Sequence, residues 1–252
     1  KTDGYISIFS WFSIFGIMMG VAANIIVMSV MNGFREELTN RILGINGHLN
    51  IYSKTGEINI EQVNILKNIK YENDITILPT IETQALLIND ENSRGVYLRG
   101  YSSNDIKEKN FLIGKIKEGR SFSENPNDIL VGYILANKLG LKVGQKVKIA
   151  IPKTNKTIFG NIPRFKTLII SGIFDLGMYE YDSNLVFTNS IIPRKLIMIN
   201  DESFNKIEIF SDDPNNIETL QKKIDNELKS ISQFLYTYSW KENNASLINA
   251  LK

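Results

Sequence analysis

The feature that most constrains this chain is an uncharged stretch near its N-terminus. Residues 4–34 contain no Asp, Glu, Lys, Arg or His, and about 20 apolar residues in a helix already span the ~30 Å hydrocarbon core of a bilayer. The apolar region of a signal peptide has only ~7–15 residues and is followed by a cleavage site of small residues. The sequence therefore predicts a membrane helix over residues 1–34, in preference to a signal peptide or a soluble core helix.

Some residues of this helix indicate contacts inside the membrane. Gly16 and Gly20 form a GxxxG pattern, in which small residues let another helix approach closely. Asn24 places an amide in hydrocarbon, where it needs a partner or a wet cavity. Met28 and Met31 are first interpreted as ordinary contacts with lipid or with another helix. A single span that begins at residue 1 with almost no flank favours a piece of a longer protein.

The remainder of the chain predicts an α+β domain outside the membrane. Residues 35–47 continue as a helical connector that ends at Gly44 and Gly47. For residues 48–240 the pattern predicts one domain with βαβ-like outer parts and a β-rich insertion at about 95–200. Residues 241–252 resemble the start of a further helix. We expect strands at 48–52, 75–88, 95–101, 129–131, 146–151, 167–174, 184–188, 206–210 and 234–240, and helices at 61–69, 133–139 and 216–231.

Composition and motifs argue against several functions. A net charge of +2 without a Lys/Arg cluster argues against nucleic acid as a partner, and the lack of cysteine removes disulfides and thiolate metal sites. No GxxxxGK[ST] phosphate loop occurs. His48 is the only histidine and is expected to have a plain surface or packing role, not a catalytic one. The adjacent acids Glu36-Glu37 and Asp212-Asp213 cannot face one metal together. We expect no catalysis, no bound cofactor and no metal.

The segment at residues 153–166 has two interpretations. It joins two predicted strands and carries apolar residues around Gly160 and Pro163, with basic residues on both sides. One interpretation is a long hairpin whose apolar tip folds back on its own domain. The other is an exposed apolar tip that grips a partner. The chemistry of the residues leaves both open.

Several motifs resemble those of one family. Residues 15–17, 20–22 and 25–34 (ending SVMNGF) and Arg41-Ile-Leu-Gly44 are similar to the first membrane helix of the lipoprotein-releasing permeases of the Lol system. These LolC/LolE-type proteins are membrane subunits of MacB/FtsX-like ABC transporters. The resemblance continues through GMYEYD at residues 177–182 and through residues 244–252, and so covers the whole chain. Where the family usually has proline before the histidine, this chain has Gly47.

The resemblance implies a location and a set of partners. It implies a bacterial inner-membrane protein with a cytoplasmic N-terminus, a periplasmic domain and three further membrane helices. The implied partners are a separate ATPase subunit that uses ATP and Mg, a second permease copy or paralogue, a periplasmic lipoprotein chaperone, the lipoprotein substrate and membrane lipids. Related alternatives are a MacB-like exporter of peptides or toxins and an FtsX-like scaffold that regulates cell-wall hydrolases.

The resemblance also implies roles for individual residues. Acyl chains of the cargo are expected against Met28, Met31 and Phe34, and helix packing at Gly16, Gly20 and Asn24. One family subunit captures the chaperone with a hairpin hook whose tip reads FxPxGxIP. The corresponding residues here have a shorter approach and no proline before the glycine, which leaves the subunit type open. They are Ile158, Phe159, Gly160, Ile162, Pro163 and Arg164.

Overall fold

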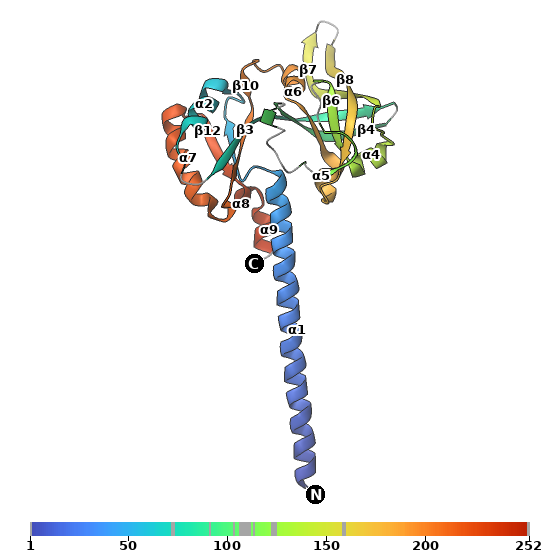
Figure 1. Ribbon diagram of the computed structural model, residues 1–252, viewed down its shortest axis with the longest axis vertical. Coiled ribbons are helices and arrows are strands. Elements are labelled where there is room, and N and C mark those ends of the chain that lie inside the picture. The colour runs from blue at the N-terminus through green and yellow to red at the C-terminus, as the bar shows by residue number, and fades with distance from the viewer. Residues whose placement is uncertain are drawn as a thin grey trace.

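The computed structural model of the chain shows a head of two lobes at one end of a long helix (Figure 1). It describes residues 2–71, 74–90, 92–102, 104–105, 112, 114–121, 125–157 and 160–250, and of residues 2–9, 152–162, 247 and 250 only the backbone.

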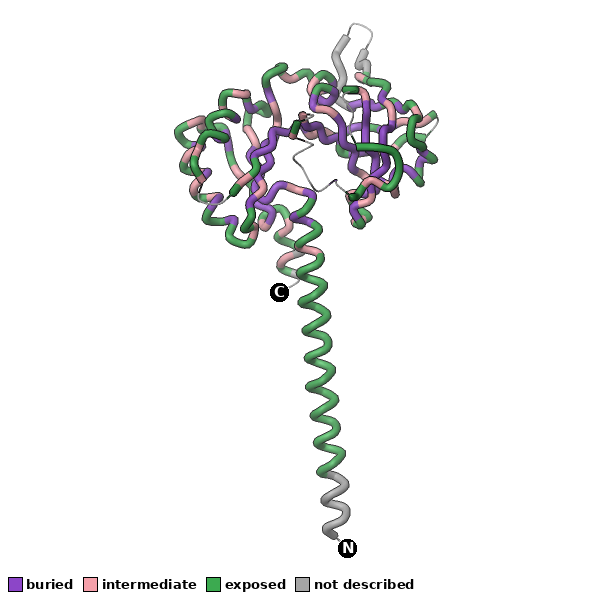
Figure 2. The backbone as a smooth tube through the Cα atoms, in the orientation of Figure 1, coloured by how far each residue is buried: buried purple, intermediate pink, exposed green. Residues whose placement is uncertain are grey.

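Helix α1 (Thr2–Ile45) runs without a break through the predicted membrane helix and the predicted connector. From Ser10 to Glu37 every residue is exposed, and Figure 2 shows this part of the helix standing clear of the head. Burying apolar surface is worth about 25 cal/mol per Å², so a bare apolar helix of this length requires lipid or another chain around it. Within the described chain, α1 is the one helix long and apolar enough to cross a membrane.

The sheet lobe comprises residues 48–80 and 199–243 and contains a four-stranded antiparallel sheet. Its order is β12 (Leu235–Ser239), β1 (Leu49–Ser53), β11 (Lys206–Ser211) and the first part of β3 (Ile75–Asn89). Helix α2 (Ile60–Asn68) lies between β1 and β3 in sequence, and α7 (Ile217–Ile231) lies between β11 and β12. Each helix therefore connects two parallel strands that have a third strand between them.

Both helices cover the same face of this sheet. Residues 217, 220, 224 and 228 of α7 are buried at helical spacing, and they share a core with Val63 and Leu66 of α2. The strands contribute alternate residues to this core, such as Leu49 and Ile209. The residues in between, including Glu208, point to the opposite face.

The barrel lobe comprises residues 81–198 and is a closed ring of six strands. The second part of β3 pairs with β4 (Asn92–Tyr101), and the ring continues through β9 (Leu185–Asn189), β6 (Asp128–Gly132), β8 (Gly160–Phe174) and β7 (Lys146–Thr157) back to β3. Strand β5 (Ile116–Gly119) extends the sheet beyond β8. The apolar residues of the ring form one core with residues of α4 (Tyr133–Leu139) and α6 (Ile191–Ile197).

Strand β3 belongs to both lobes. Residues 75–80 pair with β11, and residues 81–89 pair with β4. The β-rich insertion therefore begins at residue 81 and not at about residue 95 as predicted. The sequence conceals this boundary because it lies inside one continuous strand and not in a loop or turn between strands.

The remaining elements are short. Helix α5 (Tyr179–Asn184) lies at the lower edge of the barrel lobe beside the end of α1, and α9 (Ala245–Ala250) lies along α1 (Figure 1). Ile248 of α9 packs on the core that includes Leu43 of α1. The others are β2 (Ile58–Asn59) paired with β10 (Ser203–Phe204), η2 (Pro214–Asn216) and α8 (Trp240–Asn243).

Candidate functional site at the end of the membrane helix

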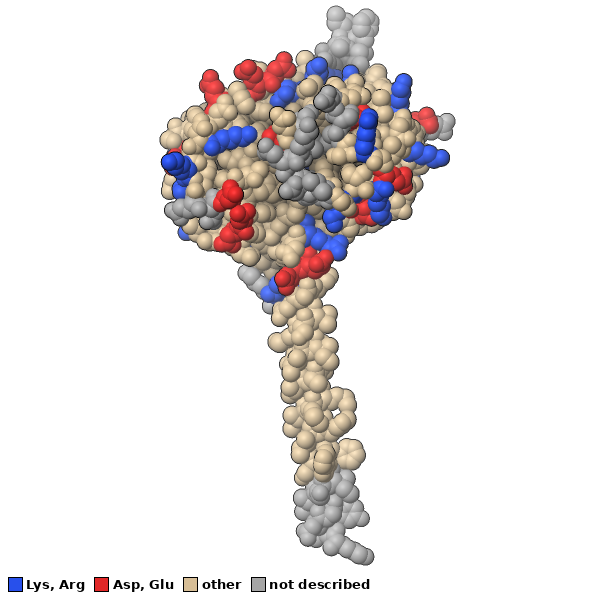
Figure 3. Space-filling model, in the orientation of Figure 1, with Lys and Arg blue, Asp and Glu red and all other residues tan. Residues whose placement is uncertain are grey.

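The last turns of α1 are where the helix meets both lobes. Ile42, Leu43 and Ile45 are buried, in contrast to the exposed helix before them. Leu43 packs in the core of the sheet lobe, and Ile45 packs in a third apolar cluster that holds Leu78 of β3 and Tyr101 of β4. In Figure 3 charged side chains gather around this junction, whereas the described helix below it is uncharged.

Gly47 and His48 lead the chain from α1 into β1. A Cβ atom at Gly47 would lie 2.9 Å from the Cβ of Glu208, so glycine is needed for the chain to pass this close to β11. The Nδ1 atom of His48 accepts a hydrogen bond from the Ser211 amide at 3.0 Å, and its Nε2 lies 3.2 Å from the Leu43 carbonyl oxygen. These partners require a neutral ring with its proton on Nε2. His48 is buried, so of the surface and packing roles left open by the sequence it has the packing role.

Two polar side chains connect the end of α1 to the barrel lobe. Arg41 donates a hydrogen bond from Nη1 to the Gly177 carbonyl oxygen at 2.6 Å. Asn46 donates from Nδ2 to the Tyr181 hydroxyl at 2.5 Å, and its Oδ1 accepts from both terminal nitrogens of Arg99 at 3.2 Å. Both the nitrogen and the oxygen of the Asn46 amide therefore have hydrogen-bond partners in the barrel lobe.

The GMYEYD motif forms the loop and helix that receive these contacts. Gly177 has φ of +73°, and a Cβ atom there would lie 2.6 Å from the Arg41 guanidinium. Asp182 accepts hydrogen bonds from the amides of Leu176 (2.8 Å) and Met178 (3.1 Å) and thereby closes the loop. Burial is the main cause that raises the pKa of Asp182 above its usual range. The motif shapes a docking loop for the membrane helix.

A buried ion cluster lies behind Asn46 and joins the two lobes. Arg99 of β4 bonds Glu82 of β3 at 2.6 Å and lies 3.5 Å from Glu208 of β11. Lys206 of β11 lies 3.3 Å from Glu82 and 3.1 Å from Glu208. The Tyr101 hydroxyl donates to Glu208 at 2.6 Å. Two cations and two carboxylates balance, which is the condition under which charges are tolerated away from water.

The cluster shifts the titration of its own members. Burial alone would raise the pKa of Glu82, but the charges of Arg99 and Lys206 outweigh it and hold that pKa below its ordinary value. Burial lowers the pKa of Lys206, but Glu208, Glu82 and Tyr52 together outweigh burial and raise that pKa above its ordinary value. Burial and then Glu208 raise the pKa of Tyr101. Glu82, Arg99 and Lys206 therefore stay charged over the physiological range.

Two open cavities lie beside this junction, against the outer face of β3 and β4. The smaller, of about 220 Å³, reaches the ion cluster and is lined by Glu82, Tyr97, Arg99, Glu180, Tyr181, Asn184 and Leu185. The larger, of about 390 Å³, is lined by Gln84, Ala85, Leu86, Gly95, Val96, Tyr97 and Asn184. Tyr97 and Asn184 line both, so the two cavities adjoin along β4.

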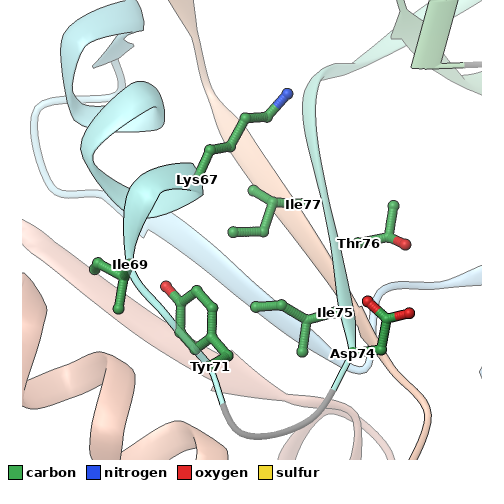
Figure 4. Close-up of a pocket in the computed structure, with 7 residues that line it drawn as sticks. All are labelled: Lys67, Ile69, Tyr71, Asp74, Ile75, Thr76 and Ile77. Carbon is green, nitrogen blue, oxygen red and sulfur yellow. The ribbon is translucent and has the colours of Figure 1, made fainter.

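A third cavity of about 460 Å³ lies in the sheet lobe, between the end of α2 and the start of β3 (Figure 4). Figure 4 shows the Lys67 ammonium and the Asp74 carboxylate on different sides of it. The Tyr71 hydroxyl already donates to the Leu66 carbonyl oxygen at 3.1 Å, and burial raises its pKa to about 12. Polar groups do not converge here, so we place the candidate site at the junction.

The predicted residues of the membrane helix all lie on the exposed part of α1. Met28, Met31 and Phe34 are exposed, and a Cβ atom at Gly16 or Gly20 would meet nothing within 4 Å. Asn24 is exposed as well. Within the described chain nothing covers these six residues, and the junction includes none of them.

The predicted hook residues belong to the β7–β8 hairpin. Ile158 and Phe159 lie outside the described residues, and of Gly160 and Ile162 only the backbone, in β8, is described. Pro163 is exposed, opposite Thr154 of β7. Arg164 donates from Nη1 to the Leu196 carbonyl oxygen of α6 at 2.9 Å, which fixes the base of the hairpin to the lobe. Figure 1 shows the hairpin leaving the barrel lobe on the side away from α1.

Comparisons with known proteins decide the family. The sequence profile of the MacB-like periplasmic core domain matches residues 10–227. The chain belongs to this family. It has the fold of the periplasmic region of MacB from Actinobacillus actinomycetemcomitans, with a TM-score of 0.54 at 14% identity over 83% of this chain and 95% of that one.

Curated relatives match the helix together with the head. The chain is 30% identical over its whole length to the lipoprotein-releasing system transmembrane protein LolC of Neisseria meningitidis, and spans 60% of that protein. It is 25% identical to LolE of Haemophilus influenzae over 93% of this chain and 57% of that protein. Among the described residues, no group of three or more His, Cys, Asp or Glu is placed to hold a metal.

Proposed function

We propose that this chain is the N-terminal part of a LolC/LolE-type permease subunit, which extracts lipoproteins from the bacterial inner membrane and passes them to a periplasmic chaperone. The observation that carries the proposal is the identity to LolC, which runs through the membrane helix and the head alike. In this proposal the chain performs no catalysis, binds no cofactor and depends on a separate ATPase subunit that uses ATP and Mg. The head lies in the periplasm, and three further membrane helices and a second permease copy or paralogue complete the membrane part.

The surface of α1 supports this role because the two predicted groups share one face. Residues four or three positions apart lie above one another on a helix, and this spacing connects all six. The two glycines and Asn24 occupy the half far from the head, and the large apolar side chains of two methionines and a phenylalanine occupy the half near it. The first half suits close packing of another helix, and the second suits the acyl chains of the cargo. The stripe is Gly16, Gly20, Asn24, Met28, Met31 and Phe34.

In this proposal the energy from ATP hydrolysis is needed to move the acyl chains of the lipoprotein out of the bilayer. Moving an acyl chain out of the bilayer costs ~0.8 kcal/mol per CH₂ group, which is too much for release without coupling. We expect the double substitution Met28→Asn with Met31→Asn to abolish most lipoprotein release from vesicles that contain the assembled transporter. The control is Ile26→Asn, which is also exposed but lies on another face of α1. Equal lipoprotein release by the double variant and by the Ile26→Asn control would argue against the proposed contact between the cargo and this face of α1.

The β7–β8 hairpin supports the chaperone contact through its position. It projects away from the membrane helix (Figure 1), toward the compartment in which a periplasmic chaperone would arrive. We expect Phe159→Asp to weaken chaperone capture by the detergent-solubilised protein about tenfold or more, as for an apolar anchor at an interface. Phe165→Asp is the matched control, since Phe165 is 64% exposed on the same hairpin below the tip.

The hook experiment also separates the alternatives. A MacB-like exporter or an FtsX-like scaffold needs no chaperone-gripping hairpin at this position. Chaperone capture that is absent, or that survives Phe159→Asp unchanged, would therefore favour one of these two functions.

A further inference from the structure

The membrane helix is attached to the two lobes in different ways. It continues covalently into the sheet lobe through Gly47 and His48, and Leu43 is part of the core of that lobe. Its polar contacts with the barrel lobe are non-covalent, from Arg41 to Gly177 and from Asn46 to Tyr181 and Arg99. Movement of α1 thus acts on the sheet lobe through the chain and on the barrel lobe through side chains.

We propose that Asn46 is a latch: a positioning residue that determines whether the barrel lobe follows α1. Its contribution to transport rests on the proposed function, but the latch itself is a property of this chain. With Asn46 engaged, α1 and both lobes move together. With Asn46 released, α1 and the sheet lobe move together, and the barrel lobe turns about strand β3 near residues 80–82, where the pairing passes from β11 to β4.

The contacts around Asn46 allow its hydrogen bonds to break without leaving a buried charge unpaired. Arg99 is held by Glu82 at 2.6 Å and has Glu208 at 3.5 Å, so both of its charge partners remain when Asn46 leaves. The groups released are the neutral Asn46 amide and the Tyr181 hydroxyl, which are only partly buried, and the exposed Arg41, which keeps its ion pair with Glu37 at 2.7 Å. Water can replace the lost hydrogen bonds at such groups. The ion cluster therefore persists whether Asn46 is engaged or released, and only the hydrogen bonds to α1 and Asn46 change.

The latch also sets the direction of the β7–β8 hairpin. Because the hairpin is part of the ring of the barrel lobe, any turn of that lobe relative to α1 changes the angle between hairpin and membrane. The sheet lobe lacks this freedom because α1 runs directly into β1.

Distances between spin labels test the latch directly. The chain contains no cysteine, so pairs of introduced cysteines are labelled uniquely in the protein embedded in lipid nanodiscs. One pair joins α1 to the barrel lobe (Glu36→Cys with Phe165→Cys), and the other joins α1 to the sheet lobe (Glu36→Cys with Lys222→Cys). All three sites are exposed. No nucleotide, cargo or chaperone is present, so the result is independent of the proposed function.

We expect Asn46→Ala to shift or broaden the first distance distribution and to leave the second unchanged. Asn46→Asp retains the wild-type distances, because a carboxylate accepts from Arg99 and from the tyrosine hydroxyl. Tyr181→Phe removes only the hydroxyl and gives the effect of Asn46→Ala in weaker form, which preserves the test if Asn46→Ala fails to fold. Both distances unchanged in Asn46→Ala and Tyr181→Phe, or both distances altered alike, would overturn the proposal.

Discussion

The sheet lobe and the barrel lobe enclose their cores differently, and the difference explains where the charges lie. The barrel lobe closes its strands into a ring around apolar residues such as Leu98 and Ile149. The sheet lobe covers one face of its sheet with α2 and α7 and leaves the other face without helices from that lobe. The ion cluster and the contacts of Asn46 lie at that second face, through Lys206 and Glu208 of β11.

The comparison teaches that an open sheet can serve two purposes. Residues alternate between its faces, so β11 supplies Ile207 and Ile209 to the core and Lys206 and Glu208 to the junction. The closed ring contributes to the junction from its outer face, through Glu82 of β3 and Arg99 of β4, while the alternate residues of these strands fill its core. The lobe with the open sheet is accordingly the one into which the membrane helix runs.

The largest effect is expected at the charges between the lobes. Arg99→Met leaves Glu82 and Glu208 without their guanidinium partner in a buried setting, since only 6% of the Arg99 side chain is exposed. Breaking a buried ion pair in this way destabilises a protein by about 3–5 kcal/mol. Equilibrium unfolding of the detergent-solubilised protein measures this. Arg94→Met on the same strand is the control. A loss of unfolding free energy there as large as in Arg99→Met would contradict the claim that the buried cluster makes the larger contribution to stability.

A cavity in the barrel core tests whether the two lobes unfold together although they are built differently. Leu98 is fully buried, and Leu98→Ala is expected to cost about 2–5 kcal/mol. Trp240 reports on the sheet lobe, because it is 6% exposed in the core there; Trp11→Phe removes the signal of the membrane helix. We expect the Trp240 fluorescence transition to shift, because β3 and the ion cluster connect both lobes. An unshifted transition would mean that the lobes unfold independently.

The acid dependence of stability is expected to depend on Glu82. Its pKa in the folded protein is held below the ordinary value of 4.5 by Arg99 and Lys206, against the effect of burial. A lowered folded pKa stabilises the protein fully above the unfolded value, and this contribution disappears as the pH falls through the folded pKa. The stability difference between wild type and Glu82→Gln should therefore be constant above about pH 5 and shrink below pH 4.5. Glu36→Gln, at an exposed site on α1, is the control, and equal curves for both variants would argue against the assignment.

The smallest effect is expected at the rim of the sheet lobe. Lys241 and Glu218 form an ion pair at 2.7 Å with side chains 33% and 56% exposed. Exposed pairs contribute about 0–1 kcal/mol, so Lys241→Ala should change the unfolding free energy by no more than that. A loss comparable to Arg99→Met would erase the contrast between buried and exposed charges. Thermal unfolding of the two variants side by side makes the comparison.

Much of the fold follows from local pattern. The helix expected at residues 133–139 matches α4 at both ends, and the stripe at 216–231 differs from α7 by one residue. Short elements such as α5 and α6 escaped prediction because six or seven residues carry too little periodicity. The early start of the barrel lobe escaped prediction because β3 is one continuous strand with no turn between the two lobes.

The junction was only partly accessible from sequence. The resemblance singled out GMYEYD and noted Gly47 in place of the usual proline. The structure gives Gly177 a steric reason in its contact with Arg41 of α1, and Gly47 one in its close approach to Glu208 of β11. The ion cluster was missed because its members are scattered between residues 82 and 208. A usable signal existed at Arg99, which is the one charged residue of the predicted strand at 95–101 and as such requires a partner if it is buried. Which partner it finds depends on register between distant strands, which local sequence does not contain.

The continuity of β3 has a consequence for how such a protein can be altered or can evolve. Side chains alternate along a strand with a period of two, so inserting one residue near position 81 would turn every later side chain of β3 to the opposite face. Leu87 and Ala85 would then leave the barrel interior while residues 75–80 kept their places in the sheet lobe. The two lobes are therefore not interchangeable modules. Grafting a barrel lobe from a relative onto this sheet lobe should succeed only when the parity of the shared strand is preserved.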